Sequence, residues 1–147
     1  MQGTHEHAAD PRNEQILIDI NGTHYPRSEA KISVFDSGFI LGDGVWEGLR
    51  VEQNTVLFLE KHLDRLFEGM KTLDFQPDFD RGQLTARLYR LLAANGMRHG
   101  VHIRLMVTRG VKSTPYQDPR MTITPPTVVI IPEYKEALPE TVERGVR

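Results

Sequence analysis

The sequence predicts an α+β domain, in which an antiparallel sheet has two helices packed on it. Three observations lead to this fold class. Apolar and polar residues alternate in several short runs, as they do in half-buried strands. In the middle of the chain the apolar spacing changes to three and four residues, the pattern of one helix face. The order of strands, two helices and further strands favours a sheet covered by helices.

The first hairpin is predicted at the start of the folded region. Residues 16–20 form an apolar run that ends at Asn21-Gly22, a strong signal for a two-residue turn. Residues 23–25 then form the returning strand. Pro26 cannot donate a hydrogen bond to a ladder, so a central strand is not expected to continue there.

Further strands are predicted before the helices. Residues 31–35 alternate loosely, which predicts a strand that ends in a turn at Ser37-Gly38. Residues 45–51 and 55–59 then predict a hairpin across Gln53-Asn54. All these segments are short, as strands in small domains usually are.

Two helices are predicted next. The first begins near Leu59, and its apolar stripe consists of Leu59, Leu63, Leu66, Phe67, Met70 and Leu73. The second covers residues 81–95, with Leu84, Leu88, Leu91 and Leu92 facing inward. Asp78 or Asp80 can cap its start, and Gly96 suits the position after its end.

The last strands complete the sheet. Residues 101–108 alternate strictly, and Val101, Ile103, Leu105 and Val107 share one face. Residues 127–131 are mostly β-branched, which predicts a central strand. We therefore expect a disordered lead-in at 1–14, a small domain at 15–132, and at 133–147 a linker with the start of a missing large domain.

Composition narrows the function classes. The chain has 147 residues, 39% hydrophobic and 26% charged, which suits one globular domain. A formal net charge of −2 favours neither nucleic acid nor an anionic membrane as partner. No apolar run approaches the roughly 20 residues of a membrane span. There is no cysteine, and His5 and His7 are interpreted as part of a polar tail, so no metal site and a cytoplasmic location are expected.

Arg65 and Trp46 are the first candidate binding residues. Arg65 lies on the first helix, where a guanidinium can hold a phosphate by two parallel hydrogen bonds. The alternative is a solvated arginine paired with a nearby acid such as Glu68. Trp46 precedes Gly48, and a glycine in a strand often marks the close approach of a ligand; the alternative for Trp46 is simple core packing. Two extended runs and a helix start, joined by tight turns, are expected to bring Trp46 and Arg65 into one neighbourhood.

His102 and Arg104 share the other face of their strand, so an anionic group could be held there, although a surface pair is the commoner outcome. The Gly-rich bend at residues 42–44 is explained by a tight turn, since it matches neither GxGxxG nor a Walker motif. No motif supplies a nucleophile or a metal site, so no catalytic residue is assigned. From the residues alone, the sequence predicts an α+β domain with an anion pocket.

A family resemblance goes further. The segment at residues 34–66 reads VFDSGFILGDGVWEGLRVEQNTVLFLEKHLDRL, and residues 101–110 read VHIRLMVTRG. Together with the strand at 127–131, they resemble the class IV (fold-type IV) pyridoxal-phosphate aminotransferases. That family includes branched-chain and D-amino acid aminotransferases, aminodeoxychorismate lyases and R-selective amine transaminases. The resemblance implies the small N-terminal domain of that fold.

The resemblance assigns roles to the candidate residues. Arg65 matches the arginine that binds the phosphate of pyridoxal 5′-phosphate. Trp46 matches an aromatic residue of the substrate pocket, and Gly48 the small residue beside it in the branched-chain enzymes. Arg104 resembles an arginine that recognises an acidic substrate, whereas His102 lies where branched-chain enzymes tend to have tyrosine. The loop at 108–116 lacks the Arg-x-His pair of the D-amino acid enzymes.

The same resemblance sets the expected activity. Such enzymes transfer an amino group from an amino acid to a 2-oxo acid, and they are typically dimers with pockets completed across subunits. Their Schiff-base lysine lies in a second, larger domain, and none of the five lysines here has the matching context. The chain alone is therefore expected to be inactive, with a homodimer partner or the missing C-terminal domain completing it. Alternatives are a non-catalytic binding or dimerisation domain and part of an aminodeoxychorismate lyase-like enzyme.

Overall fold

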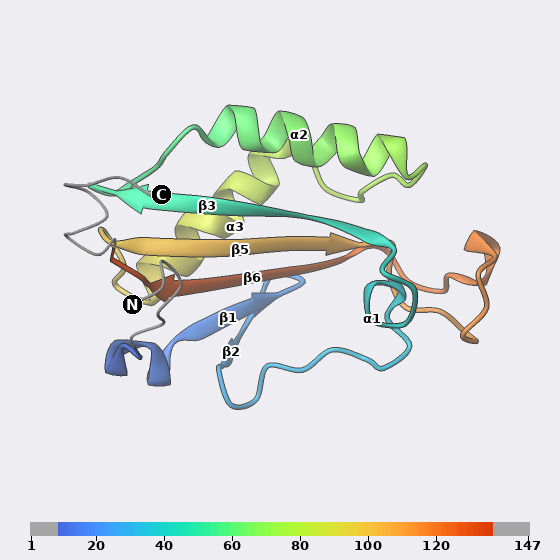
Figure 1. Ribbon diagram of the computed structural model, residues 1–147, viewed down its shortest axis with the longest axis horizontal. Helices are drawn as coiled ribbons and strands as arrows, with labels where there is room; N and C mark the ends of the chain where they lie inside the picture. The colour runs from blue at the N-terminus through green and yellow to red at the C-terminus, as the bar shows by residue number, and fades with distance from the viewer. Residues whose placement is uncertain (1–8, 137–147) are drawn as a thin grey trace, which may run out of the picture.

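The computed structural model describes residues 9–136 (Figure 1). Six strands form one antiparallel sheet in the order β2-β1-β6-β5-β3-β4. The strands are β1 (Leu17–Ile20), β2 (Thr23–Pro26), β3 (Gly44–Glu52), β4 (Thr55–Val56), β5 (Val101–Thr108) and β6 (Thr127–Tyr134). The helices are α1 (Ser37–Leu41), α2 (Leu59–Thr72) and α3 (Arg81–Ala94), with short 3₁₀ turns η1 (Pro11–Gln15) and η2 (Pro119–Met121). The predicted α+β class is confirmed.

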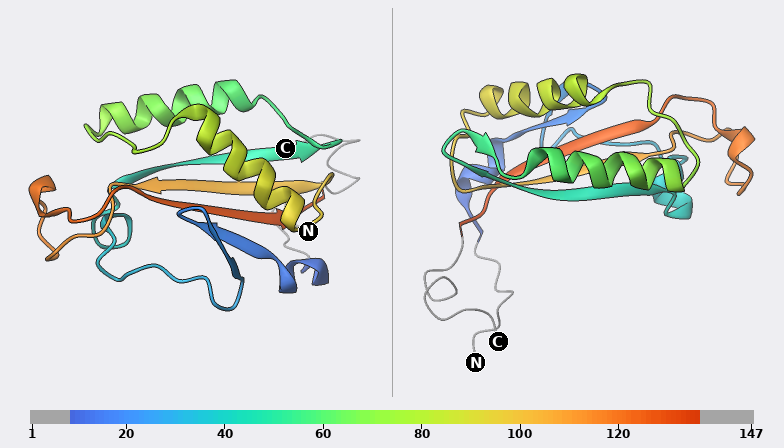
Figure 2. Two further views of the ribbon diagram at one scale, coloured as in Figure 1. Left: turned by 180° about the vertical axis from the view of Figure 1, so that it is seen from behind. Right: turned by 90° about the horizontal axis from the view of Figure 1, so that it is seen from above.

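The two long helices cover one face of the sheet. Seen from behind, α3 crosses the middle strands and α2 runs along β3 (Figure 2). The core lies between these layers and includes Leu49, Leu66, Leu88, Ile103, Leu105 and Ile130, all 1% exposed or less. On β5 every second residue is buried, from Val101 to Val107, as the alternation predicted. The other face of the sheet carries no helix within the described residues.

Several local predictions are confirmed. The first hairpin turns at Asn21 and Gly22, whose φ angles of 54° and 86° are those of a type I′ turn. At the start of α3, Asp80 accepts from the Gln83 amide at 2.8 Å while the Gln83 side chain accepts from the Asp80 amide, a full capping box. Gly96 follows the helix with φ 65°. The strand at 127–131 is central, because β6 lies between β1 and β5.

The prediction of a strand at residues 31–35 is wrong. The segment is irregular and ends in a turn, in which the Asp36 amide donates to the Ser33 carbonyl. Ser33 Oγ also accepts from the Phe35 amide at 3.1 Å, so local bonds replace a ladder. The expected turn at Ser37-Gly38 is instead the first turn of α1, capped by Asp36. The alternating apolar residues here are exposed rather than packed.

The second hairpin is confirmed, but its returning strand is shorter than expected. β4 contains only Thr55 and Val56, which pair with the end of β3. Phe58 then adopts a left-handed backbone with φ 53° and turns the chain into α2. The glycine-rich bend at 42–44 is a tight turn: Gly42 ends α1 with φ 67°, and a Cβ on Gly44 would lie 2.8 Å from the Val107 carbonyl oxygen.

The ends of the expected domain differ from the prediction where they are described. Within the predicted lead-in, Pro11–Gln15 form η1, and the Asn13 side chain is buried and bonds both backbone groups of Tyr134. β6 continues to Tyr134, beyond the predicted domain end at 132. Residues 1–8, with His5 and His7, and residues 137–147, which hold most of the expected linker, lie outside the described residues. None of the helices in the described part is long and apolar enough to cross a membrane.

Candidate functional site

A buried carboxylate on β3 organises the first part of the site. Glu47 occupies the same strand face as Val45, Leu49 and Val51, and its side chain is only 3% exposed. Arg65 donates to it from Nε to Oε1 and from Nη2 to Oε2, each at 2.6 Å. His62 Nδ1 lies 2.8 Å from Oε2. Since His62 and Arg65 are three residues apart on α2, one helix face presents both to the carboxylate.

The cluster has a defined charge state. Hydrogen bonds from Arg65, opposed by burial and helped by His62, hold the pKa of the Glu47 carboxyl below its ordinary value. The same bonds raise the pKa of Arg65. Glu47 is therefore ionised at neutral pH. Because an ionised carboxylate only accepts, His62 Nδ1 carries the proton in its contact with Glu47.

The arginine of the cluster keeps part of its donor capacity. Glu47 takes the edge formed by Nε and Nη2, and no hydrogen bond occupies Nη1 within the described residues. The Arg65 side chain is 73% exposed. The predicted alternative partner, Glu68, is not bonded to Arg65 in the described part of the chain; the partner is Glu47, which sequence reasoning missed. The available signal was a glutamate in the buried phase of an otherwise apolar strand face.

The open face of the sheet holds the other candidates. Cross-strand pairing sets Gly48 opposite Arg104 and Trp46 opposite Met106. The Arg104 guanidinium lies 3.9 Å from the centre of the Trp46 ring, within the range of a cation–π contact. Trp46 is 62% exposed, so the alternative of core packing does not apply. The two side chains form an aromatic and cationic surface on this face.

Gly48 makes room for His102. A Cβ added at Gly48 would lie 3.2 Å from His102 Nε2, which is closer than most real contacts. The imidazole therefore lies over the glycine, where a larger residue would displace it. Burial, and then the charges of Lys135, Arg104 and Arg50, lower the pKa of His102. At neutral pH the ring is thus neutral.

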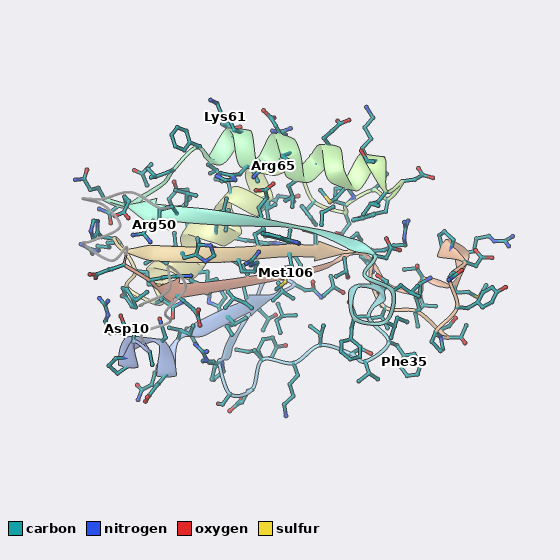
Figure 3. All side chains as sticks on the ribbon, viewed as in Figure 1. Asp10, Phe35, Arg50, Lys61, Arg65 and Met106 are labelled. Atoms are coloured by element: carbon teal, nitrogen blue, oxygen red, sulfur yellow. The ribbon has the colours of Figure 1, made fainter. Side chains whose placement is uncertain are left out.

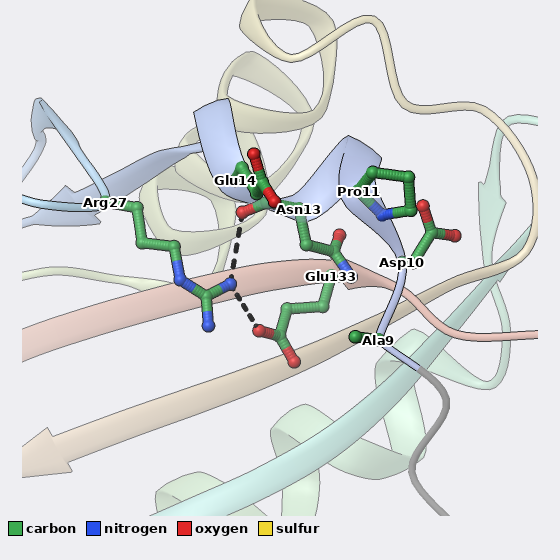
Figure 4. A pocket seen from close by; sticks show the side chains of 7 residues that line it. All are labelled: Ala9, Asp10, Pro11, Asn13, Glu14, Arg27 and Glu133. Carbon is green, nitrogen blue, oxygen red and sulfur yellow. Dashed lines mark hydrogen bonds and ion pairs between the residues drawn. The ribbon is translucent and has the colours of Figure 1, made fainter.

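His102 and Arg104 also line a hollow of about 370 Å³ on the open face. Its other lining residues are Ile18, Arg27, Ile131, Glu133 and Lys135. Arg27 donates to Glu133 at 2.7 Å and to the Asn13 carbonyl at 3.1 Å, and this pair separates the hollow from a second one of about 290 Å³ beside η1 (Figure 4). Arg104 has no ion pair among the described residues, so the first hollow offers cationic donors to an anion.

Arg65 and Trp46 do not share one pocket wall within this chain, contrary to the prediction. They flank the same strand from opposite sides: Arg65 bonds Glu47 between α2 and β3, while Trp46 points to the open face (Figure 3). Side chains of neighbouring strand residues point to opposite faces, which explains the separation. The structure therefore presents two anion-binding elements, one on each side of β3.

No other cluster competes with this site in the described part of the chain. In residues 9–136 no group of three or more metal-ligating side chains is arranged to hold a metal ion. Lys112 is the largest fully buried side chain, and its ammonium donates to the Asp118 carbonyl at 2.9 Å. This lysine anchors the loop between β5 and β6. Arg109 has a similar structural role, because it joins Asp43 to the carbonyls that follow α2.

Comparisons with known proteins identify the family. The family described as "Amino-transferase class IV" matches residues 44–146. The "Branched-chain-amino-acid aminotransferase-like protein 1" of Arabidopsis thaliana is 40% identical over 125 residues, 85% of this chain and 22% of that protein. The "D-alanine aminotransferase" of Listeria monocytogenes is 31% identical over 110 residues, 75% of this chain and 36% of that protein.

Solved structures agree with the sequence matches. A branched-chain amino acid aminotransferase from the source abbreviated T.th., complexed with N-(5′-phosphopyridoxyl)-L-glutamate, superposes with a TM-score of 0.71 and 25% identity, covering 84% of this chain and 42% of that one. The 4-amino-4-deoxychorismate lyase of Pseudomonas aeruginosa gives a TM-score of 0.67 and 32% identity, covering 85% and 42%. The chain thus spans less than half the length of these relatives. Its fold matches their small N-terminal domain, and the chain belongs to the class IV aminotransferases.

Proposed function

We propose that this chain supplies the small-domain half of a pyridoxal-phosphate-dependent aminotransferase site. Arg65 binds the cofactor phosphate, and Trp46, Gly48, His102 and Arg104 line the substrate pocket. The observation that carries the proposal is the exposed Nη1/Nη2 edge of Arg65, which suits a bidentate phosphate contact. The relative solved with a phosphopyridoxyl-glutamate adduct supports the same assignment.

The substrate side acts by recognition. Arg104, stacked on Trp46, offers its guanidinium to a carboxylate of the amino acid or of the 2-oxo acid. His102 is neutral at pH 7, so it contributes a hydrogen bond there without a further charge. Gly48 keeps the floor of this region free of a side chain. The branched-chain relatives favour a branched amino acid as one substrate.

Chemistry needs groups beyond these residues. When bound, the cofactor supplies the electron-withdrawing ring that stabilises a carbanion at the substrate Cα. We expect the general-base lysine to come from the part of the relatives' length that this chain does not cover. This chain's residues bind and orient, and the half-site alone is expected to be inactive.

Binding of pyridoxamine 5′-phosphate tests the proposal. This probe has no aldehyde, so it cannot attach covalently to surface lysines. Isothermal titration of the chain is expected to show saturable binding that Arg65→Ala weakens by about tenfold or more. The matched control is Arg90→Ala, which removes an exposed arginine from α3 and should leave binding unchanged. Absent binding, or equal loss in both variants, would reject the phosphate site.

Self-association and a cytoplasmic location belong to the same proposal. Large apolar side chains gather on α1, the segment before it and the β5–β6 loop: Val34 is 64% exposed, Phe39 69%, Tyr116 66% and Ile123 65%. Such exposure is typical of an interface. Sedimentation velocity should show a dimer, or association with a large-domain chain, that Phe39→Ser weakens. A strictly monomeric chain at all concentrations, indifferent to that variant, would argue against the dimer.

A second candidate is part of an aminodeoxychorismate lyase-like enzyme. It is favoured by the 32% identity to the Pseudomonas aeruginosa lyase, higher than the 25% to the solved branched-chain aminotransferase with the glutamate adduct. Both functions use the phosphate contact at Arg65, so they differ on the open face. Saturable protection of Trp46 fluorescence by a 2-oxo acid would favour the aminotransferase, whereas a response only to an aromatic aminocyclohexadiene carboxylate would favour the lyase.

A further inference from the structure

The Glu47 carboxylate is more enclosed than a simple surface ion pair requires. Its side chain is 3% exposed, although its partner Arg65 is 73% exposed. Three donor atoms converge on it: Nε and Nη2 of Arg65 and Nδ1 of His62. A buried carboxylate is tolerated only when such bonds compensate its lost hydration. The cluster is therefore fixed at its inner end and open to solvent at its outer end.

The geometry divides the arginine into two edges. A guanidinium carries five N–H groups in a planar fork. Glu47 occupies the Nε/Nη2 edge by two bonds of 2.6 Å, which sets the plane and the direction of the group. The three remaining N–H groups lie on the Nη1/Nη2 edge. An arginine held in this way loses less conformational freedom when it binds an anion than a free one would.

His62 contributes the third bond. Its Nδ1 donates to the same Glu47 oxygen, Oε2, that accepts from Arg65 Nη2. The histidine side chain is 21% exposed, so it covers the carboxylate on the helix side. This contact limits rotation of the carboxylate and so keeps its two oxygens in line with the arginine.

We propose that Glu47 and His62 are positioning residues, which hold Arg65 so that its Nη1/Nη2 edge faces a phosphate dianion. The inference rests on the proposed phosphate role of Arg65 and adds two residues to it. Glu47 acts against its own charge here, since a carboxylate behind the guanidinium repels the dianion. Orientation and charge therefore predict opposite effects when the carboxylate is neutralised.

The isosteric variant Glu47→Gln separates these effects. If Glu47 positions Arg65, the variant should bind pyridoxamine 5′-phosphate about tenfold more weakly, because one charge-assisted bond is lost. Binding of pyridoxamine, which lacks the phosphate, should not change. His62→Gln should show the same selective loss, but a smaller one. Stronger phosphate binding by Glu47→Gln would mean that the carboxylate acts only through its charge, which overturns the inference.

A second measurement follows Arg65 itself. In ¹H–¹⁵N spectra, the Nε–H of Arg65 should give a resonance protected from solvent exchange, assigned by its loss in Arg65→Ala. Glu47→Gln and His62→Gln should speed its exchange, while the backbone amide spectrum shows that the fold is kept. Unchanged exchange in both variants would also overturn the inference.

The outcomes distinguish this inference from the function beneath it. If Arg65→Ala leaves phosphate binding unchanged, the proposed function and the positioning role both fail. If Arg65→Ala weakens binding while Glu47→Gln and His62→Gln do not, only the positioning role fails. Arg90→Ala again serves as the control, because Arg90 is an exposed helix arginine outside the cluster.

Discussion

The two faces of the sheet are built from the same strands but hold different kinds of residue. Toward the helices, Leu105 and its neighbours are 0–1% exposed and form one continuous core. Toward the open side, the intervening residues of β3 and β5 include Trp46, His102 and Arg104, which are partly exposed. One face therefore provides stability, and the other provides groups that recognise a ligand. Glu47 is the exception, a carboxylate on the covered face.

The largest expected effect compares neighbours on β5. Leu105→Ala removes a fully buried side chain and should lower the free energy of unfolding by about 2–5 kcal/mol. Met106→Ala, one residue along on the open face, should lower it by less than about 1 kcal/mol. Equilibrium urea unfolding measures both values. Equal losses would show that the open face is packed in solution.

The second prediction concerns the carboxylate on the covered face. The pKa of Glu47 is lowered in the folded state, so its stabilising contribution is present above its unfolded value of 4.5 and is lost as pH falls through the folded value. Glu47→Gln should cost about 1–2 kcal/mol at pH 7 and remove this contribution to acid sensitivity. Urea unfolding of both proteins from pH 7 to pH 3 is the measurement. Parallel curves over that range would contradict the assigned charge state.

A smaller effect is expected for the stack on the open face. Arg104→Ala removes a cation–π contact that contributes about 0.5–1 kcal/mol at an exposed site. Because Trp46 is the only tryptophan, its fluorescence reports this change directly. Removal of the guanidinium should increase the quenching of Trp46 by acrylamide. Identical quenching in both proteins would place Arg104 elsewhere in solution.

The smallest expected effect is on stability in Gly48→Ala. The added methyl group would press on His102 Nε2, a side chain that can move, so unfolding should change by less than about 1 kcal/mol. The added burial should lower the pKa of His102 further below its ordinary value. An NMR titration of the His102 ring measures this shift. A raised pKa would mean that the ring has moved out to water.

Most of the fold could be predicted from local patterns. The alternation on β5, the helical spacing on α2 and α3, and the Asn21-Gly22 turn each specify an element within a few residues. The segment at 31–35 was predicted wrongly because alternation requires a partner strand, whereas Ser33 provides local bonds that end the extended run. Strand assignment from alternation alone does not detect such competition.

The site was only partly predictable. Arg65, Trp46, Gly48, His102 and Arg104 were named from the sequence, but their distribution on two sides of β3 was not. Glu47 lies 15 and 18 residues from its partners, so no helical or strand spacing relates the three. Their contact depends on how α2 packs on β3, which is a tertiary feature.

The sheet edges limit how this domain can associate. β2 ends at Pro26, which has no N–H to offer, and β4 contributes only two residues on the opposite edge. Alongside the rest of β3 runs α2 (Figure 1). A neighbouring chain therefore finds no long edge to which it can add a strand, the route by which many β proteins polymerise. Contacts with other chains are directed to the open face and to the apolar end around α1, where they can be closed and specific.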